Sequence, residues 1–158
     1  MVIVVGMSDM KISKDPGDIL VTYSLGSCVG VTAYDPAAKV GGLLHLMLPD
    51  SSLNSGKAQS NPFVFADTGV PAMIRALTKS GALKNRMKIV VAGGAQILDP
   101  AGPFKIGRRN FGATRECLKK LHLFADYEEV GGHVDRTLRL IMETGSTLIQ
   151  TSMEKFQV

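Results

Sequence analysis

The chain has 158 residues, of which 45% are hydrophobic and 20% are charged, a balance typical of a folded domain with its own core and not of a disordered chain. The 18 basic and 14 acidic side chains give a formal net charge of +4, which suits an acidic protein partner as well as nucleic acid. Trp is absent, and no tract of Lys and Arg is interleaved with aromatic residues, so the composition disfavours nucleic-acid binding as the main activity.

Brief apolar runs rich in β-branched residues predict several strands in the first part of the chain. They cover residues 2–5, 19–23, 29–34 and 40–48. Turn signals separate them, among them Pro16-Gly17 and Asp35-Pro36. The connections between the last three runs are too short for crossover helices, so we expect these three strands to pair antiparallel.

The segment 51–62 is rich in Ser, Asn and Gly, lacks periodicity and is predicted to be the longest loop. After it, apolar residues at helical spacing predict a helix that begins near Asp67 or Thr68 and ends at Gly81. We expect Pro71 to lie close to the first turn of this helix, since a proline deeper inside would cost about 3 kcal/mol.

The second half predicts a strand over residues 87–92, a loop over 99–103 and a helix over 106–121. Three late strands follow, at 124–130, 136–143 and 147–152. The whole pattern predicts a single α+β domain over residues 1–158, in which packed, mostly antiparallel β-sheets are flanked by two main helices.

Cys28 and Cys117 are the only cysteines, too few for a disulfide framework and consistent with a reducing compartment. A cysteine is most often a small buried apolar residue, and Cys117, on the apolar face of its predicted helix, fits that interpretation. Cys28 instead follows a strand and the small residues Gly26 and Ser27, so its thiol could be an accessible nucleophile. Backbone N–H groups at the corner formed by Gly26 and Ser27 could receive an oxyanion.

His45 lies within an apolar run. A lone histidine there is usually a satisfied core residue, but beside Cys28 it would act as a general base or form a thiolate–imidazolium pair. Thr22 is either a β-branched strand residue or a group that orients the imidazole or polarises the substrate carbonyl. His122, at a helix end, and His133, in a glycine turn, have weaker cases.

Metal and nucleotide chemistry find no support in the motifs. The cysteines and histidines lack the spacing of a zinc site, and the glycine pairs form neither a dinucleotide fingerprint nor a Walker A loop. We therefore expect no metal and no organic cofactor. No basic leader precedes the apolar start, and no run reaches the roughly 18 apolar residues of a membrane span, so we expect a cytoplasmic protein without membrane insertion. The residues alone point to a cysteine–histidine hydrolase.

The segments 21–28, VTYSLGSC, and 45–49, HLMLP, resemble the signature of the chemoreceptor glutamine deamidases, the CheD family. Further matches follow in the family's order along nearly the whole chain: Ala66-Asp67-Thr68, Ala92-Gly93-Gly94-Ala95, Ile106-Gly107-Arg108-Arg109-Asn110, Gly131-Gly132 with Arg136, and Glu143-Thr144-Gly145. No single match is decisive, but the ordered set is specific.

The resemblance implies a chemotaxis enzyme that hydrolyses particular glutamine side chains on chemoreceptors to glutamates. The family's catalytic Cys, His and Thr fall on Cys28, His45 and Thr22, and the implied chemistry runs through a thioester without a cofactor. The implied fold resembles the catalytic domain of cytotoxic necrotising factor. The implied partners are the cytoplasmic domain of a methyl-accepting chemotaxis receptor, as substrate, and a CheC-type phosphatase. Nothing demands more than a monomer.

Other interpretations stay open beside this one. The same acyl chemistry would also cleave a glutamate methyl ester, and a non-catalytic regulator could retain the fold and bind the phosphatase or the receptor. The basic side chains of the second helix could steer the protein to an acidic receptor, or form an ordinary solvated face. These side chains are Arg108, Arg109, Arg115, Lys119 and Lys120.

Overall fold

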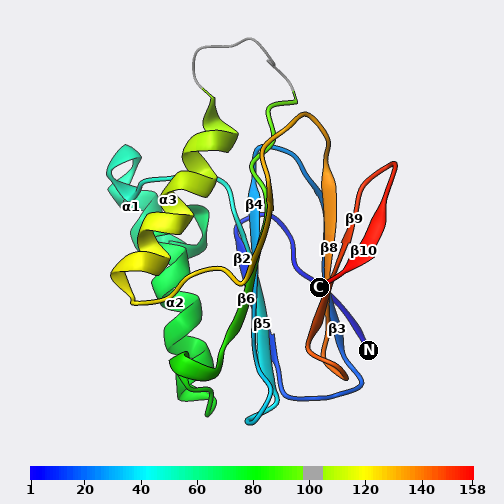
Figure 1. Ribbon diagram of the computed structural model, residues 1–158. Helices are drawn as coiled ribbons and strands as arrows, with labels where there is room; N and C mark the ends of the chain where they lie inside the picture. The colour runs from blue at the N-terminus through cyan, green and yellow to red at the C-terminus, as the bar shows by residue number, and fades with distance from the viewer. Residues whose placement is uncertain (98–104) are drawn as a thin grey trace.

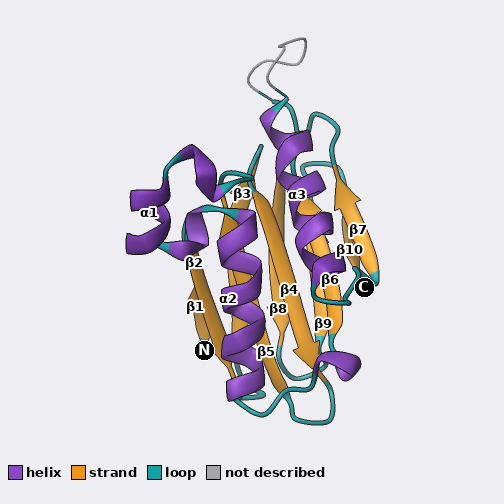
Figure 2. Ribbon diagram, turned by 90° about the vertical axis from the view of Figure 1, so that its left-hand side faces the viewer, coloured by secondary structure: helices purple, strands orange, loops and turns teal. Residues whose placement is uncertain are grey.

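Two five-stranded β-sheets lie face to face in the computed structural model, and helices cover the outer face of one of them (Figures 1 and 2). The structure describes residues 1–97 and 105–158, so the loop expected over 99–103 lies outside the described residues. Both sheets are mixed, and the fold is α+β as predicted. Within the described residues, no helix has the length and apolarity that a membrane crossing requires.

The first sheet, called sheet A here, has the strand order β1-β3-β8-β9-β10. Its strands are β1 (Val2–Val4), β3 (Ile19–Leu25), β8 (Arg136–Ile141), β9 (Ser146–Gln150) and β10 (Lys155–Gln157). Strand β1 runs parallel to β3, and the other neighbours are antiparallel. Sheet A therefore joins strands from the two ends of the chain.

The second sheet, called sheet B, has the strand order β2-β5-β4-β6-β7. Its strands are β2 (Asp9–Ser13), β4 (Val29–Asp35), β5 (Val40–Leu46), β6 (Lys88–Gly93) and β7 (Tyr127–Val130). Every residue of β4 and β5 is buried, because sheet A covers one face of these strands and helices cover the other. Burial on both faces explains why their sequences read as continuous apolar runs.

The helices are α1 (Ser55–Ser60), α2 (Ala66–Lys79) and α3 (Ile106–Lys120). Helix α2 packs on β5, and α3 packs beside it over β4 and β6 (Figure 2). Val31, Leu44, Met73 and Leu118 belong to the core between sheet B and the helices. A separate core between the two sheets includes the fully buried Leu138 of β8. The site described below lies in that inter-sheet layer.

The predicted strands at 29–34, 40–48 and 87–92 and the helix at 106–121 are confirmed to within a few residues. The expected pairing was partly wrong. Strands β4 and β5 do pair antiparallel, but β3 joins the other sheet and pairs with β8, more than 110 residues away in sequence. Strands β2 and β10 were not predicted. The β2 sequence DMKIS is largely polar, and β10 is only three residues long.

The segment 51–62 is not an irregular loop, since it contains α1 and a short 3₁₀ turn at Ser51–Leu53, and a second 3₁₀ turn, Pro62–Val64, begins at its last residue. The Asn54 side chain caps α1 by accepting from the Lys57 N–H. Helix α2 begins at Ala66 with Phe65 as its N-cap, and Asp67 instead accepts hydrogen bonds from Ser51. Pro71 is the sixth residue of α2, one turn deeper than expected.

Candidate active site

Cys28 lies at the crossing of the chain from sheet A to sheet B. The register between β3 and β8 shifts between Thr22 and Leu25, and Ser24 within this irregularity has a φ of 54°. Such a bulge bends a strand and re-aims the chain that follows it. The corner 26–28 leaves sheet A at this point, and β4 begins in sheet B at Val29.

The corner is held by its carbonyl groups. The Ala95 N–H donates to Gly26 O (2.9 Å), the Gly94 N–H donates to Cys28 O (2.8 Å), and Asn110 Nδ2 donates to Ser27 O (2.8 Å). The N–H groups of the same three corner residues donate to no other residue within 1–97 and 105–158. Unpaired N–H groups beside a nucleophile are the donors that an oxyanion needs.

Gly93 is required by this arrangement. Its φ is +108°, a conformation that residues with a side chain rarely adopt. A Cβ atom at this position would overlap the carbonyl oxygen of Cys28. The glycine at the end of β6 therefore allows the close approach that brings the next two N–H groups onto the corner.

His45 and Cys28 face the same inter-sheet layer. His45 of β5 is directly opposite Gly30 of β4, and Cys28 precedes Gly30 by two residues. In an antiparallel pair this makes Cys28 and His45 diagonal neighbours on one face, with Cα atoms roughly 7–8 Å apart. Consistent with this placement, the Cys28 side chain packs against the core between the sheets. Gly30 contributes no side chain to the space between them.

Thr22 fixes the imidazole from the opposite sheet. Its Oγ1 lies 2.7 Å from His45 Nδ1 and 2.7 Å from the carbonyl oxygen of Val5. A carbonyl oxygen only accepts, so the single Thr22 hydroxyl proton is donated to Val5, and Nδ1 must donate to Oγ1. The neutral imidazole then carries its lone pair on Nε2. That atom is buried and has no hydrogen-bond partner among the described residues, Cys28 included.

Burial keeps both groups neutral at rest. It lowers the pKa of His45 to about 4 and raises the pKa of the Cys28 thiol, because the charged form of each group loses its hydration in the inter-sheet layer. The sequence left two forms of the Cys28–His45 pair open. The geometry and the pKa shifts favour a neutral thiol with a general base over a resting thiolate–imidazolium pair.

A cleft of about 730 Å³ opens onto Cys28. Its walls come from the corner, from residues 95–97, from the start of α3 and from residues 133–135. His133 belongs to this wall, and its Nδ1 lies 2.9 Å from the carbonyl oxygen of Gln96.

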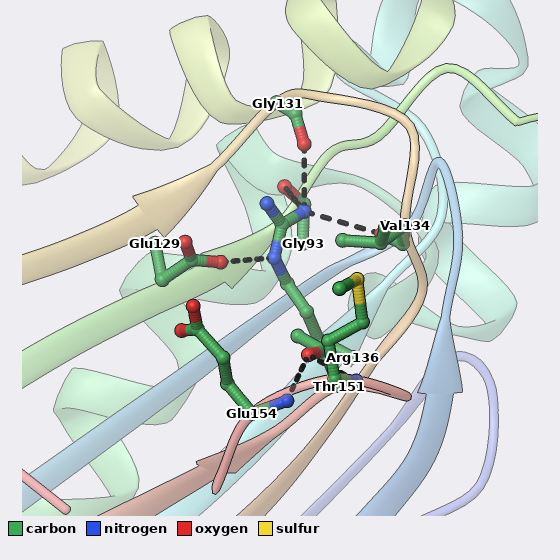
Figure 3. Close-up of polar contacts among 8 residues, drawn as sticks. Gly93, Glu129, Gly131, Val134, Arg136, Thr151 and Glu154 are labelled. Carbon is green, nitrogen blue, oxygen red and sulfur yellow. Dashed lines mark hydrogen bonds and ion pairs between the residues drawn. The ribbon is translucent and has the colours of Figure 1, made fainter. Parts of the chain in front are cut away.

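Arg136 contacts this wall, since its Nη1 lies 3.5 Å from the carbonyl oxygen of Val134, and Figure 3 shows its polar contacts. The guanidinium is buried, extends from β8, and pairs through Nε with Glu129. Its Nη1 donates to Gly131 O at 2.7 Å and to Gly93 O at 3.3 Å. Arg136 thereby joins β8 of sheet A to the ends of β6 and β7 in sheet B. In the sequence, Arg136 directly follows the cleft residues 133–135.

The remaining candidates lie elsewhere or serve other roles. Cys117 is buried on α3, and burial raises its pKa to about 11, which fits a core residue. His122 follows the end of α3, away from the cleft around Cys28. Across the described ranges 1–97 and 105–158, no three His, Cys, Asp or Glu side chains gather in a group that could hold a metal.

Sequence reasoning missed the roles of Asn110 and Arg136, although both belong to the segments that carried the family resemblance. For Asn110 a signal exists: it precedes Thr114 by four residues and Cys117 by seven, so it falls on the buried face of the helix. A polar amide in that stripe needs partners, and partners supplied by distant segments are invisible in the sequence.

Fold and site together define an α+β protein of two packed sheets with a candidate cysteine–histidine site at their edge. A family model described as "CheD chemotactic sensory transduction" matches residues 47–151. The chain is 47% identical over 150 residues to "Probable chemoreceptor glutamine deamidase CheD 1" of Syntrophus aciditrophicus, covering 95% of this chain and 94% of that protein. The chain belongs to the CheD family.

Two further relatives carry the name "Probable chemoreceptor glutamine deamidase CheD". The protein of Caldanaerobacter subterraneus subsp. tengcongensis is 45% identical, covering 93% of this chain and 91% of its own length. That of Solibacter usitatus is 42% identical, covering 94% of this chain and 88% of its own length. The matches to these two relatives span both the corner 26–28 and the cleft wall at residues 133–135.

The fold also resembles a solved structure of distant sequence. The crystal structure of Neisseria meningitidis protein NMB0706, of the family DUF152, superposes with a TM-score of 0.51 at 10% identity. The match covers 83% of this chain and 64% of that one. At this identity the likeness concerns the fold alone.

Proposed function

We propose that this protein is a glutamine deamidase acting on chemoreceptors, with Cys28 as nucleophile, His45 as general base and acid, and Thr22 as the residue that orients His45. The proposal rests on family membership and on the names of the relatives. The observation that carries the residue roles is the buried Nε2 of His45, which has no hydrogen-bond partner among the described residues. Thr22 sets the tautomer of this imidazole, and His45 shares a sheet face with Cys28.

In the first step, Cys28 gives its thiol proton to His45 Nε2 while the sulfur attacks the carboxamide carbon of a glutamine side chain. The carbonyl oxygen becomes an oxyanion, and its donors are the N–H groups of the corner 26–28, which donate to no residue that the structure describes. Cys28 and His45 are not hydrogen-bonded to each other in the structure. The hydrogen bond between a catalytic nucleophile and its base often forms only when substrate binds.

In the second step, protonated His45 gives its proton to the amide nitrogen, so that ammonia leaves and a thioester with Cys28 remains. Water then attacks the thioester and gives a proton to His45. Cleavage of the carbon–sulfur bond returns the proton to the sulfur and releases glutamate. A glutamate methyl ester would follow the same route with methanol as the leaving group, so we propose weak methylesterase activity as well.

Several expectations accompany this function. We propose that residues 1–158 act as one domain, as a cytoplasmic monomer, on the cytoplasmic part of a chemoreceptor, and that a CheC-type phosphatase is a second partner. A positive patch on α3 is compatible with an acidic partner, although Arg115 is already engaged by Glu128 at 2.7 Å.

The test is to incubate chemoreceptor cytoplasmic fragments with the wild type, with Cys28→Ala and with the matched control Cys117→Ala, and to follow the fragments by peptide mass spectrometry. We expect a gain of about one dalton at specific glutamines with the wild type and with Cys117→Ala, and no gain with Cys28→Ala. No gain with the wild type, or an equal gain with Cys28→Ala, would overturn the proposal and favour the non-catalytic regulator or another nucleophile.

A further inference from the structure

Asn110 of α3 lies between the two segments that carry the candidate nucleophile and base. Its side chain is completely buried. Nδ2 lies 2.8 Å from the carbonyl oxygen of Ser27 and 2.9 Å from the carbonyl oxygen of Met47. Ser27 directly precedes Cys28, and Met47 follows His45 by two residues. One amide group thus ties the nucleophile corner to the end of the strand that carries the base.

The Asn110 amide donates both of its protons, while its oxygen accepts no hydrogen bond from any described residue. In the described parts of the chain, two buried side-chain atoms have no hydrogen-bond partner: Oδ1 of Asn110 and Nε2 of His45. A buried acceptor without a donor costs free energy, so it is retained only where something else requires the group. For His45 the requirement is a free lone pair. For Asn110 it is the pair of N–H donors.

The bond to Ser27 also has a consequence for the oxyanion donors. The carbonyl of Ser27 and the N–H of Cys28 belong to the same planar trans peptide, in which the two groups point in opposite directions. By binding Ser27 O, Asn110 sets the plane of that peptide and directs the Cys28 N–H away from α3. This N–H is among those that donate to no other described residue.

We propose that Asn110 is a positioning residue for the deamidation reaction: it fixes the corner against the His45 strand and aims the Cys28 N–H at the developing oxyanion. The inference rests on the proposed function. It adds a residue of α3 to a site whose other members come from β3, the corner and β5.

The chain offers a matched control one turn along the same helix. Thr114 is also completely buried on the inner face of α3, and its hydroxyl donates to the Asn110 carbonyl at 2.9 Å. Thr114→Val removes a buried hydrogen bond from this face without touching the corner. Asn110→Asp keeps the shape of the side chain but replaces its two donors by an acceptor that faces two carbonyl oxygens.

The experiment compares wild type, Asn110→Asp and Thr114→Val on the receptor fragment, at a temperature where circular dichroism shows each to be folded. Loss of a whole oxyanion donor costs about 100- to 1,000-fold in kcat, so misdirecting one should lower kcat by at least about 10-fold in Asn110→Asp. KM should change by less than about twofold, because Asn110 does not line the cleft that opens onto Cys28. Thr114→Val should keep kcat near the wild-type value. If the kcat of Asn110→Asp equalled that of Thr114→Val, the inference would be overturned.

A second measurement needs no substrate, so it separates failure of this inference from failure of the proposed function. The rate of iodoacetamide alkylation is measured at Cys28 and at Cys117 in each protein. Release of the corner should expose the Cys28 thiol and raise its rate by at least about fivefold in Asn110→Asp, with Cys117 unchanged. Equal acceleration at both cysteines would mean general loosening and would overturn the inference. Should Asn110→Asp not fold, Asn110→Ala, which buries no charge, takes its place with the same expected outcomes.

Discussion

Thr22 Oγ1 and His45 Nδ1 lie 2.7 Å apart although the two residues belong to different sheets. The contact gives the imidazole one tautomer, because the Thr22 proton is already donated to Val5. In serine and cysteine hydrolases a third residue commonly performs this task, usually a carboxylate or an amide. A hydroxyl performs it here without adding a negative charge, so burial is free to keep the pKa of His45 low.

Replacing Thr22 should therefore reduce turnover through the imidazole. Thr22→Val removes the acceptor for Nδ1–H and should lower kcat by about 10- to 100-fold, within the range that general base catalysis contributes. Thr22→Ser keeps the hydroxyl and should stay within about threefold of the wild type. The measurement is steady-state deamidation of a receptor fragment.

The control for this pair is Thr32→Val. Thr32 Oγ1 makes a buried 2.7 Å hydrogen bond to Thr147 Oγ1, also between the two sheets but away from the cleft. We expect Thr32→Val to lose stability and to keep kcat. If Thr32→Val and Thr22→Val lost the same activity, the Thr22 effect would reflect sheet packing and not the orientation of His45.

The low pKa of His45 makes stability depend on pH in a defined window. Its folded pKa of about 4 is below the unfolded value of about 6.5, so the unfolded chain binds more protons between these values and stability falls as pH falls from about 6.5 to 4. The loss at pH 4 should be about 3 kcal/mol from this residue. Asp18, Asp35 and Asp50 also have lowered pKa values, but they lose their contributions mainly below about pH 4.

Urea unfolding of the wild type and of His45→Gln at several pH values measures this effect. The wild type should lose stability steadily from pH 6.5 to 4.5, and the variant should show a much flatter curve over the same range. Parallel curves would show that His45 is not the buried neutral group described here.

Alkylation separates the two cysteines. Cys28 is partly exposed in a cleft, whereas Cys117 is buried and has a pKa of about 11. Iodoacetamide should modify Cys28 well before Cys117 in the folded protein, as read by peptide mapping, and both should react alike after denaturation. Because burial raises the Cys28 pKa, its rate should keep rising above pH 8.5. A rate that is constant from pH 5 upward would indicate a stable thiolate and contradict the neutral resting pair.

Arg136 should affect substrate binding more than turnover, because it holds the wall that residues 133–135 form. Arg136→Met leaves the carbonyl oxygens of Gly93 and Gly131 without the guanidinium and should raise KM by about 5- to 20-fold, or roughly 1–2 kcal/mol. Arg139→Met is the control: Arg139 lies on the same strand but pairs with Gln150 and stacks near the Tyr23 ring. A KM that rises equally in both variants would point to a general effect of β8.

The sequence predicted local features well and contacts between distant segments poorly. Strands β4 and β5 were visible as apolar runs because they are buried on both faces, and α3 was visible through its period. The polar strand β2 could not be found, since only its pairing with β5 makes it a strand. The pairing of β3 with β8 depends on closure of a chain segment of more than 110 residues, for which no local pattern exists.

The candidate site shows the same division. Cys28 and His45 could be named because a small-residue corner and a lone histidine are conspicuous in the sequence, whereas the catalytic role of Thr22 was predicted from the family resemblance alone. Gly93 was named only within a segment that matches the family, and the structure shows that a Cβ atom there would overlap the Cys28 carbonyl oxygen. Asn110 depends on two backbone carbonyls that lie 83 and 63 residues away.

Sheet A draws strands from both ends of the chain, and this has a consequence for how the protein becomes active during synthesis. Cys28, His45 and Thr22 all precede β8 in the sequence and therefore leave the ribosome before it. Strand β3, which carries Thr22, is paired with β8, and the Arg136 that holds the cleft wall begins that same strand. A nascent chain can therefore contain every candidate catalytic group and still lack the strand β8 that pairs with β3, so Cys28, His45 and Thr22 are not brought together in the folded arrangement until β8 has emerged.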